Sequence, residues 1–200
     1  MIAIIDYGMG NLRSVQKAFE YLGAEAVITD DAARIASASH VILPGVGAFC
    51  DAIARLQETK LDTALLQSAA SGKPVLGICL GMQMMFAHSE ENGFYDGLGL
   101  FPGTVTRFVD QGLKIPHMGW NTLSTLACPL FDADQHPEVY FVHSYCMADI
   151  SEDWTAATCT YGQTFTAAIC RDNVMATQFH PEKSGTAGLA MLKRFAALRY

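Results

Sequence analysis

The stretch around Cys79 constrains the fold of this chain more than any other. Residues 74–78 are apolar and partly β-branched, as in a buried parallel strand. Residues 82–86 tolerate a helix, and Cys79 stands between the two segments, with Gly77 two residues before it and Gly81 two residues after. Gly-x-Cys-x-Gly in this position is the pattern of a nucleophile elbow, a sharp strand-to-helix turn that strains the backbone of its central residue. We therefore expect an α/β fold with a reactive thiol at the end of a strand.

The elbow geometry would place the Cys79 thiol at the N-terminus of a helix. Unpaired backbone N–H groups and the helix dipole favour a thiolate there and can bind an oxyanion. The Leu80 N–H is the first candidate donor, and a second is expected from the loop of a neighbouring strand. Val46 and Gly47 suit that role, because their loop follows an expected strand at 40–43. The alternative is an inert cysteine in a core strand, since free cysteine is often buried.

The rest of the pattern predicts one domain, residues 1–200, built on an open, mostly parallel sheet with helices on both faces, as in flavodoxin-like folds. Apolar spacing predicts helices at 12–22, in segments up to about residue 70, and at 186–198. Residues 124–138 give no clear signal. Strands are expected at 2–6, 26–29, 40–43 and 74–78, and then, as an antiparallel extension of the C-terminal half, at 103–108, 119–123, 139–145, 155–161, 165–169 and 174–179.

The composition argues against several functions. Half of the 200 residues are hydrophobic and 16% are charged, which is typical of a globular protein. The net charge of -7 makes a nucleic-acid-binding surface unexpected, and no apolar run approaches the roughly 18–20 residues that span a bilayer. The first residues predict a strand without a basic segment, so no signal peptide is expected.

No cofactor or metal is expected either. Gly8-x-Gly10 follows the first strand, but Arg13 occupies the third glycine position of a dinucleotide-binding fingerprint. The six cysteines include no CxxC pair and no zinc spacing. An even number of cysteines could form disulfides, but the size and character of the chain favour a reducing cytoplasm.

A cysteine nucleophile needs a base, and His180 is the best candidate. It ends an expected strand and is followed by Pro181 and Glu182. Proline disfavours a helical conformation for the residue before it, so a carboxylate two residues on can reach the imidazole and fix its tautomer. His143, inside the expected strand at 139–145, is the competing base, although a hydrogen-bonded strand histidine is the interpretation that we favour for it.

These motifs resemble those of the class I, triad-type glutamine amidotransferases. The Gly-Ile-Cys-Leu-Gly-Met-Gln elbow (77–83) and Phe-His-Pro-Glu (179–182) are shared by that whole superfamily. The resemblance extends from residue 4 to about residue 185. Within the superfamily, five segments are similar to those of the glutaminase subunits of imidazole glycerol phosphate synthases: Asp-Tyr-Gly-Met-Gly-Asn (6–11), Pro-Gly-Val-Gly-Ala-Phe (44–49), Pro-His-Met-Gly-Trp-Asn (116–121), Phe-Val-His-Ser-Tyr (141–145) and His-Pro-Glu-Lys-Ser (180–184).

The resemblance implies hydrolysis of L-glutamine to L-glutamate and ammonia. The reaction would pass through a thioester on Cys79, with His180 and Glu182 completing a triad. The implied oxyanion donors are the Leu80 N–H and an N–H of the 45–47 loop. The residues that the resemblance places against the glutamine are Gly45, Gln83, His143, Ser144 and Tyr145.

The resemblance also implies a partner. Ammonia is mostly protonated in neutral water and is then not nucleophilic, so a synthase needs it delivered through a dry path. The implied partner is a separate (β/α)₈-barrel cyclase subunit, which uses the ammonia to make imidazole glycerol phosphate and aminoimidazole carboxamide ribonucleotide in histidine biosynthesis. Trp120 is a candidate interface anchor, because tryptophan is enriched in hot spots, and Asn11 and Lys183 are further candidates. A core tryptophan and a solvated lysine are the alternatives.

Two other functions stay open at this point. The chain could be the glutaminase of another synthase, such as one that makes anthranilate, a purine nucleotide or pyridoxal phosphate. It could also be a non-catalytic flavodoxin-like binding module in which Cys79 is buried or redox-active.

Overall fold

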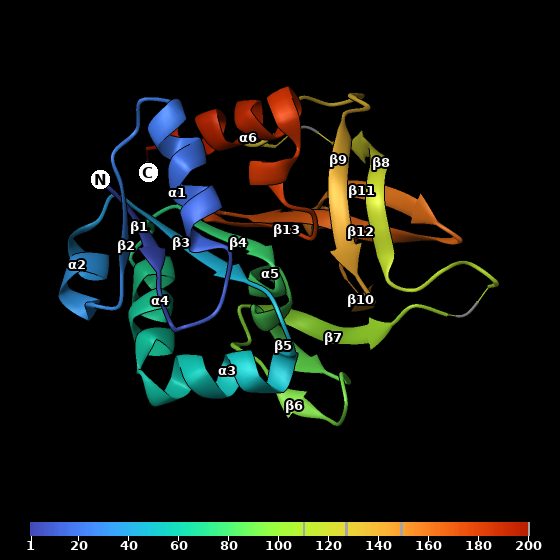
Figure 1. Ribbon diagram of the computed structural model, residues 1–200, viewed down its shortest axis with the longest axis horizontal. Helices are drawn as coiled ribbons and strands as arrows, with labels where there is room; N and C mark the ends of the chain where they lie inside the picture. The colour runs from blue at the N-terminus through green and yellow to red at the C-terminus, as the bar shows by residue number, and fades with distance from the viewer. Residues whose placement is uncertain (110, 127, 149, 200) are drawn as a thin grey trace.

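The computed structural model describes residues 1–109, 111–126, 128–148 and 150–199. These residues form a large sheet with helices on both faces and a smaller sheet beside it (Figure 1). The helices are α1 (Leu12–Tyr21), α2 (Ala32–Ser37), α3 (Phe49–Glu58), α4 (Leu61–Ala70), α5 (Leu80–Met84) and α6 (Gly185–Ala197), with 3-10 turns η1 (Glu152–Trp154) and η2 (Pro181–Lys183).

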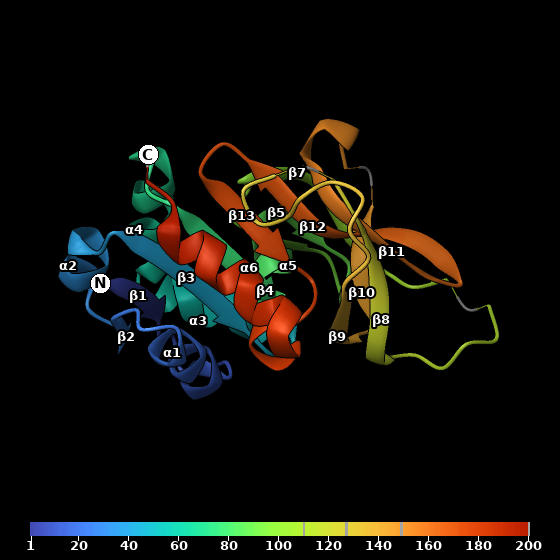
Figure 2. The same cartoon turned by 90° about the horizontal axis from the view of Figure 1, so that it is seen from above.

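The strands of the large sheet are, in spatial order, β2 (Ala26–Thr29), β1 (Ile2–Ile5), β3 (His40–Gly45), β4 (Val75–Cys79), β13 (Val174–Thr177), β12 (Gln163–Arg171), β11 (Thr155–Tyr161), β8 (His117–Thr125) and β9 (Glu138–His143). Neighbours from β2 to β13 are parallel, in the 2-1-3-4-5 order of flavodoxin-like folds. Neighbours from β13 to β9 are antiparallel, and they twist away from the parallel half (Figure 2). The predicted parallel sheet with an antiparallel extension is confirmed.

Alternate residues of the parallel strands face opposite layers of helices. Ile2 and Ile4 of β1 belong to the core that includes apolar residues of α1 and α6. Ala3 and Ile5 belong to the core on the other face, with α2, α3 and α4. Both faces of these strands are therefore buried (Figure 1), which explains why they read as continuous apolar runs.

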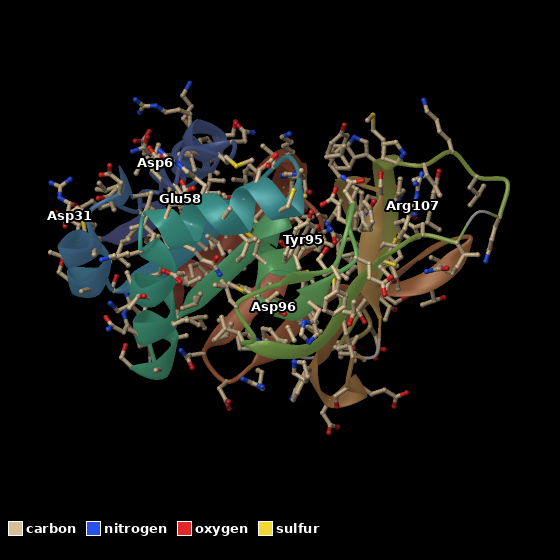
Figure 3. The ribbon with its side chains drawn as sticks, turned by 90° about the horizontal axis from the view of Figure 1, so that it is seen from below. Asp6, Asp31, Glu58, Tyr95, Asp96 and Arg107 are labelled. Carbon is tan, nitrogen blue, oxygen red and sulfur yellow. The ribbon has the colours of Figure 1, made fainter. Side chains whose placement is uncertain are left out.

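The apolar pattern does not predict α2. Only Ile35 of its six residues is buried, so the helix has almost no apolar stripe. It begins after Asp31, whose carboxylate accepts a hydrogen bond from the Ala33 N–H at 2.8 Å at the edge of the molecule (Figure 3). This N-terminal cap is the local signal for the helix.

The pattern assigns the expected strand at 103–108 to the antiparallel extension, whereas this strand lies in the small sheet. The strands of the small sheet, in spatial order, are β10 (Tyr145–Ala148), β7 (Phe101–Arg107), β5 (Phe86–Ser89) and β6 (Tyr95–Asp96). The helix-tolerant residues after the elbow form only the five-residue helix α5. That helix ends because the Leu98 and Phe101 N–H groups donate to the carbonyls of Met84 and Met85. The expected strand at 139–145 is divided between the two sheets. Its residues up to His143 belong to β9 of the large sheet, and Tyr145 begins β10 of the small sheet.

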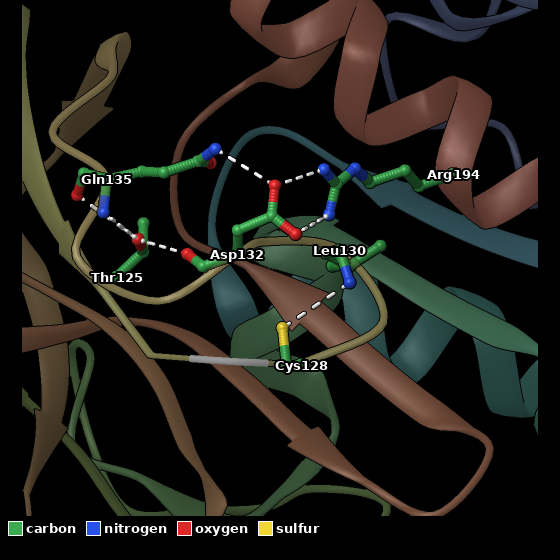
Figure 4. A network of polar contacts seen from close by, with 6 residues as sticks. All are labelled: Thr125, Cys128, Leu130, Asp132, Gln135 and Arg194. Atoms are coloured by element: carbon green, nitrogen blue, oxygen red, sulfur yellow. Dashed lines mark hydrogen bonds and ion pairs between the residues drawn. The ribbon is translucent and has the colours of Figure 1, made fainter.

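The described part of the 124–138 loop is held against α6 by side chains. The Arg194 guanidinium donates to both carboxylate oxygens of Asp132, at 3.0 and 2.5 Å, and this pairing lowers the pKa of Asp132. Gln135 donates to the same carboxylate, and the Thr125 hydroxyl donates to the Asp132 carbonyl at 2.7 Å (Figure 4). Polar contacts of this kind leave no periodic pattern in the sequence.

Candidate active site

Strand β4 ends at Cys79 in the strained conformation of a nucleophile elbow. The φ and ψ angles of Cys79 are 56° and -111°, a region that residues with a side chain rarely adopt. Helix α5 begins with the next residue, Leu80. Because α5 is so short, its dipole is small, and the Leu80 N–H at its first position is the more important group for an oxyanion.

Close packing explains the glycines around the elbow. A Cβ on Gly81 would collide with the Leu43 carbonyl of β3, and a Cβ on Gly77 would lie 3.0 Å from the backbone of α5. Gly45 lies opposite Cys79 in the β3–β4 register, and a Cβ there would lie 2.8 Å from the Gly81 nitrogen. Gly45 therefore supports the elbow. It is not among the described residues that line the cavity, so its expected substrate contact stays a prediction.

The loop from β3 to α3 lies against the elbow. Val46 and Gly47 line the same cavity as Cys79. Gly47 has a φ of +102°, in the left-handed region that favours glycine. The buried Tyr7 hydroxyl donates to the Pro44 carbonyl at 2.9 Å and so holds the start of the loop. Burial and the nearby Cys79 raise the pKa of Tyr7, which keeps this hydroxyl a neutral donor.

The order of the strands in the large sheet places His180 close to Cys79. Strand β13 pairs with β4, and the chain leaves β13 toward His180 at the same edge where β4 ends. His180 Nδ1 lies 2.8 Å from Glu182 Oε1, and the two side chains are only 2% and 1% exposed. The carboxylate accepts from Nδ1, so the other ring nitrogen, Nε2, can exchange a proton with a reacting group.

The charge of His180 is set by its neighbours. Burial disfavours the imidazolium, but Cys79 and the Glu182 carboxylate outweigh burial and raise the pKa of His180 to about 9. In the described residues, His180 Nε2 and Glu182 Oε2 have no hydrogen-bond partner. The Cys79 sulfur, besides acting on His180, lies 3.8 Å from the Gln178 amide nitrogen and 4.0 Å from the Val142 carbonyl oxygen. His180 thus keeps one nitrogen available in the cavity.

The cavity has a volume of about 300 Å³, the size for a small molecule. It brings together most of the residues predicted from the sequence, which come from β4, α5, the end of β9, the start of β10 and the loops beside these elements. The predicted residues that line it are Val46, Gly47, Cys79, Leu80, Gln83, His143, Ser144, Tyr145 and His180. Glu182 lies behind His180, as an orienting carboxylate should.

The geometry also decides between the two candidate bases. His143 Nδ1 lies 2.8 Å from the Tyr145 carbonyl oxygen, and His143 Nε2 lies 3.0 Å from His117 Nδ1. Both ring nitrogens of His143 are therefore engaged inside the protein. Burial lowers the pKa of His143 to about 3, so the ring is neutral. His143 is a hydrogen-bonded strand histidine, and His180 is the candidate base.

The sequence-based prediction misses two residues at this site. Glu91 lines the cavity, and its Oε2 accepts a hydrogen bond from the Phe49 N–H at 2.8 Å. Gln178, completely buried, accepts from the Gln83 amide at 3.0 Å while its own amide nitrogen faces Cys79. Glu91 follows β5, which the pattern does not reveal, and a glutamine in a strand-like segment has no periodic signature.

Two of the three predicted interface residues share one surface. Trp120 on β8 is 56% exposed, so the alternative of a core tryptophan is wrong. Its ring packs edge-on against Tyr140 at 6.2 Å, and the Lys183 ammonium lies 5.9 Å from the same Tyr140 ring. Asn11 is the N-cap residue of α1, a helix that contacts η2, the turn that contains Lys183.

The family model of glutamine amidotransferase class I matches residues 3–198. The chain belongs to the class I glutamine amidotransferase family. Solved structures agree on the fold of this amidotransferase. The crystal structure of a glutamine amidotransferase superposes with a TM-score of 0.77 at 17% identity, over 98% of this chain and 99% of that chain. The structure of PurLQS from Thermotoga maritima gives a TM-score of 0.78 at 20% identity, over 97% and 96%. At such identities the likeness shows the fold alone.

Closer relatives place this amidotransferase more narrowly. It is 55% identical over 205 residues to the imidazole glycerol phosphate synthase subunit HisH of Thermosynechococcus vestitus, covering 98% of this chain and 96% of that protein. It is 52% identical over 203 residues to the same subunit of Syntrophotalea carbinolica, covering 98% of each. The amidotransferase is thus an enzyme subunit of the HisH family. No helix in the described parts of the chain combines the length and apolar character needed to cross a membrane.

Proposed function

We propose that this amidotransferase is the glutaminase subunit of an imidazole glycerol phosphate synthase, with Cys79, His180 and Glu182 as its catalytic triad. The observation that carries the proposal is the buried His180–Glu182 pair, which shares a cavity with a strained cysteine. The HisH relatives, about half identical over nearly their whole length, support the same reaction.

The first half of the reaction forms a thioester. The Cys79 thiolate attacks the side-chain carboxamide carbon of glutamine, and the oxyanion is bound by the Leu80 N–H and an N–H of the Val46–Gly47 loop. The C–N bond then breaks as His180 Nε2 gives its proton to the leaving ammonia. Removing one oxyanion donor costs roughly 3–4 kcal/mol of barrier, and proton transfer by His180 contributes about 10²- to 10⁴-fold.

The second half releases the product. Water attacks the γ-glutamyl thioester and gives a proton to His180 Nε2, and the C–S bond breaks. Glutamate leaves, and the Cys79 thiolate beside a protonated His180 is restored. Glu182 stays ionised throughout and stabilises the imidazolium.

The cavity wall supplies the contacts that hold glutamine. The Glu91 carboxylate is suited to the α-ammonium group, because one of its oxygens is fixed by a backbone N–H of α3. Gln83 and the backbone of residues 143–145 line the opposite wall and suit the α-carboxylate and the carboxamide. Binding by many fixed polar groups places the carboxamide carbon in reach of the thiolate.

The ammonia is proposed to pass to a separate (β/α)₈-barrel cyclase subunit in the histidine pathway. Trp120 is the proposed anchor, because an exposed tryptophan beside Tyr140 and Lys183 forms an aromatic and cationic surface. Asn11 remains a proposed contact on α1. The cytoplasm is the proposed compartment, in keeping with six cysteines that are all free thiols.

A glutaminase assay with and without the cyclase subunit tests this function. Glutamine-dependent formation of imidazole glycerol phosphate in the presence of the cyclase is the expected result, with slower hydrolysis by the isolated chain. Product formed instead with an anthranilate, purine or pyridoxal phosphate synthase would assign the chain to another pathway. No hydrolysis under any of these conditions would reject the catalytic interpretation altogether.

A further inference from the structure

A row of polar groups runs from strand β8 to the wall of the cavity. Asn121 Nδ2 lies 3.3 Å from His117 Nε2, and His117 Nδ1 lies 3.0 Å from His143 Nε2. His143 Nδ1 in turn lies 2.8 Å from the Tyr145 carbonyl oxygen. His117 and His143 are directly opposite each other in the β8–β9 register, so both rings point to the same buried face of the sheet.

The two ends of this row fix the direction of every hydrogen bond. The Tyr145 carbonyl can only accept, so His143 carries its proton on Nδ1 and its Nε2 accepts. At the other end, the Asn121 amide nitrogen also donates to the Thr160 carbonyl at 3.0 Å, and the Asn121 oxygen accepts a backbone N–H at 2.8 Å. The amide nitrogen therefore faces His117 Nε2 as a donor. His117 must then carry its proton on Nδ1 and donate to His143, which is what the first end also requires.

The buried surroundings of the two imidazole rings support the same proton positions. Burial lowers the pKa of His117 to about 4 and that of His143 to about 3, so both rings are neutral. In the described residues, their nitrogens have no further hydrogen-bond partners. Four aromatic side chains pack around the two imidazole rings: Phe108, Phe141, Tyr161 and Phe165.

The end of the row is the point where the chain crosses between sheets. Strand β9 of the large sheet ends at His143, and β10 of the small sheet begins at Tyr145. The Tyr145 carbonyl accepts from His143 and also from the Gln83 amide at 3.3 Å. The Ser144 carbonyl accepts from the Phe108 N–H at 3.1 Å. These hydrogen bonds fix the Ser144–Tyr145 wall of the cavity. The wall lies between the two sheets, so the backbone hydrogen bonds of either sheet alone would not fix it.

We propose that His117 is a positioning residue of the glutamine pocket. Its hydrogen bond keeps His143 in the tautomer that donates to the Tyr145 carbonyl, and this fixes the Ser144–Tyr145 wall and the Gln83 amide against bound glutamine. The inference rests on the proposed function, since it takes glutamine as the occupant. His117 itself touches no reacting group.

A matched pair of variants tests the role. In His117→Asn, the amide nitrogen takes the place of Nδ1 and can still donate to His143. In His117→Leu, a side chain of similar size and branching has no donor. With the cyclase complex, His117→Leu should raise the glutamine KM about tenfold, the effect of one buried hydrogen bond, while kcat changes less. His117→Asn should stay within about threefold of the wild type, because it restores the bond.

Labelling of Cys79 provides the control. Its reaction with methyl methanethiosulfonate, followed on the Cys79 peptide by mass spectrometry, should proceed at the wild-type rate in both variants. Equal KM values in the wild type and both variants overturn the positioning role, and so does an equal loss in both variants. Slower labelling in His117→Leu would show a general disturbance of the site and also overturn it.

Nitrogen NMR of ¹⁵N-histidine-labelled protein reads the tautomers without glutamine. The His143 proton should be on Nδ1 in the wild type and in His117→Asn, and should redistribute in His117→Leu. A wild-type proton on His143 Nε2 overturns the inference. If the wild-type complex hydrolyses no glutamine, the proposed function fails, and glutamine as the occupant fails with it. Hydrolysis with an unchanged KM in His117→Leu overturns only the positioning role.

Discussion

Two buried pairs that contain histidine, His180–Glu182 and His117–His143, lie at the cavity wall and differ in the charge of the imidazole. His180 bonds to a carboxylate at 2.8 Å, and its pKa is raised to about 9. His117 and His143 bond to each other at 3.0 Å, and their pKa values are lowered to about 4 and 3. His180 is 2% exposed and His117 is 3% exposed, so burial does not distinguish the pairs.

The difference lies in what each ring meets. Glu182, together with Cys79, supplies negative charge that offsets the loss of water around an imidazolium. A second imidazole supplies only a lone pair, so the His117–His143 pair stays neutral and cannot take up a proton near neutral pH. The same residue type thus serves as a proton carrier on one wall and as a fixed hydrogen-bond donor on the other.

The strongest test of this comparison removes the sulfur beside His180. Cys79→Ala should lower glutamine hydrolysis by the cyclase complex about 10⁴-fold or more, because the nucleophile is lost. The pKa of His180 should fall as well, since one of its two anionic neighbours is gone. Assays and an NMR titration of His180 measure both effects, with Cys50→Ala on α3 as the unaffected control. A His180 pKa that does not move would show that Glu182 alone sets it.

Removing the carboxylate should have the next largest effect. Glu182→Gln keeps the size of the side chain but offers the ring a neutral partner, so kcat should fall about 10²- to 10⁴-fold. Glu90→Gln is the matched control, because Glu90 is an exposed carboxylate that does not line the cavity although its chain neighbour Glu91 does. Steady-state kinetics of the two variants decides the point, and equal activities would remove Glu182 from the triad.

The two pairs should make stability depend on pH in opposite directions. The folded pKa values of His117 and His143 lie below the unfolded value of about 6.5. Their contribution is complete above that pH and is lost as the pH falls toward 4. His180 has a raised pKa, so its contribution is complete below about 6.5 and is lost as the pH rises through 9.

Urea unfolding between pH 4 and pH 9 measures how the unfolding free energy depends on pH. The curve has an acid limb, set by His117 and His143, and an alkaline limb, set by His180. The acid limb of His117→Asn should be flatter than that of the wild type, because the variant has one fewer group to protonate on unfolding. The alkaline limb should be the same in both proteins. Parallel acid limbs would mean that His117 is not the group responsible.

An exposed histidine–carboxylate pair should show the smallest effect. His88 Nδ1 lies 3.0 Å from Asp96 Oδ1, a distance similar to that in the His180–Glu182 pair, but the side chains are 42% and 82% exposed. Asp96 lies on the small sheet (Figure 3). Water screens such a pair, so Asp96→Asn should change the unfolding free energy by less than about 1 kcal/mol and leave hydrolysis unchanged. A larger loss of activity would show that the pair acts beyond the surface.

The predictable parts of this site are those encoded over a few residues. Cys79 is identified by the glycines around it, and Glu182 by its two-residue distance from His180 across a proline. The bounds of β2 and β11 match the predicted strands at 26–29 and 155–161, because their runs of apolar and β-branched residues are followed by Asp30 and Gly162. Each of these inferences needs only local geometry.

The parts that cannot be predicted depend on distant contacts. The end of α5 is set by N–H groups from residues 98 and 101, and the wall at Ser144 is set by the meeting of two sheets. Glu91 and Gln178 acquire their places through those contacts. His117 was visible only as part of a motif, since its role depends on facing His143 across a strand pair.

Strand β13 gives this fold an order of assembly. It is the last strand in the described chain, yet it lies in the interior of the large sheet, and β4 and β12 are joined only through it. During synthesis from the N-terminus, Cys79 therefore leaves the ribosome well before its base. The parallel half can form with the thiol in place, but His180 cannot reach it until β13 inserts. The thiol acquires its catalytic base only when the two halves of the sheet join.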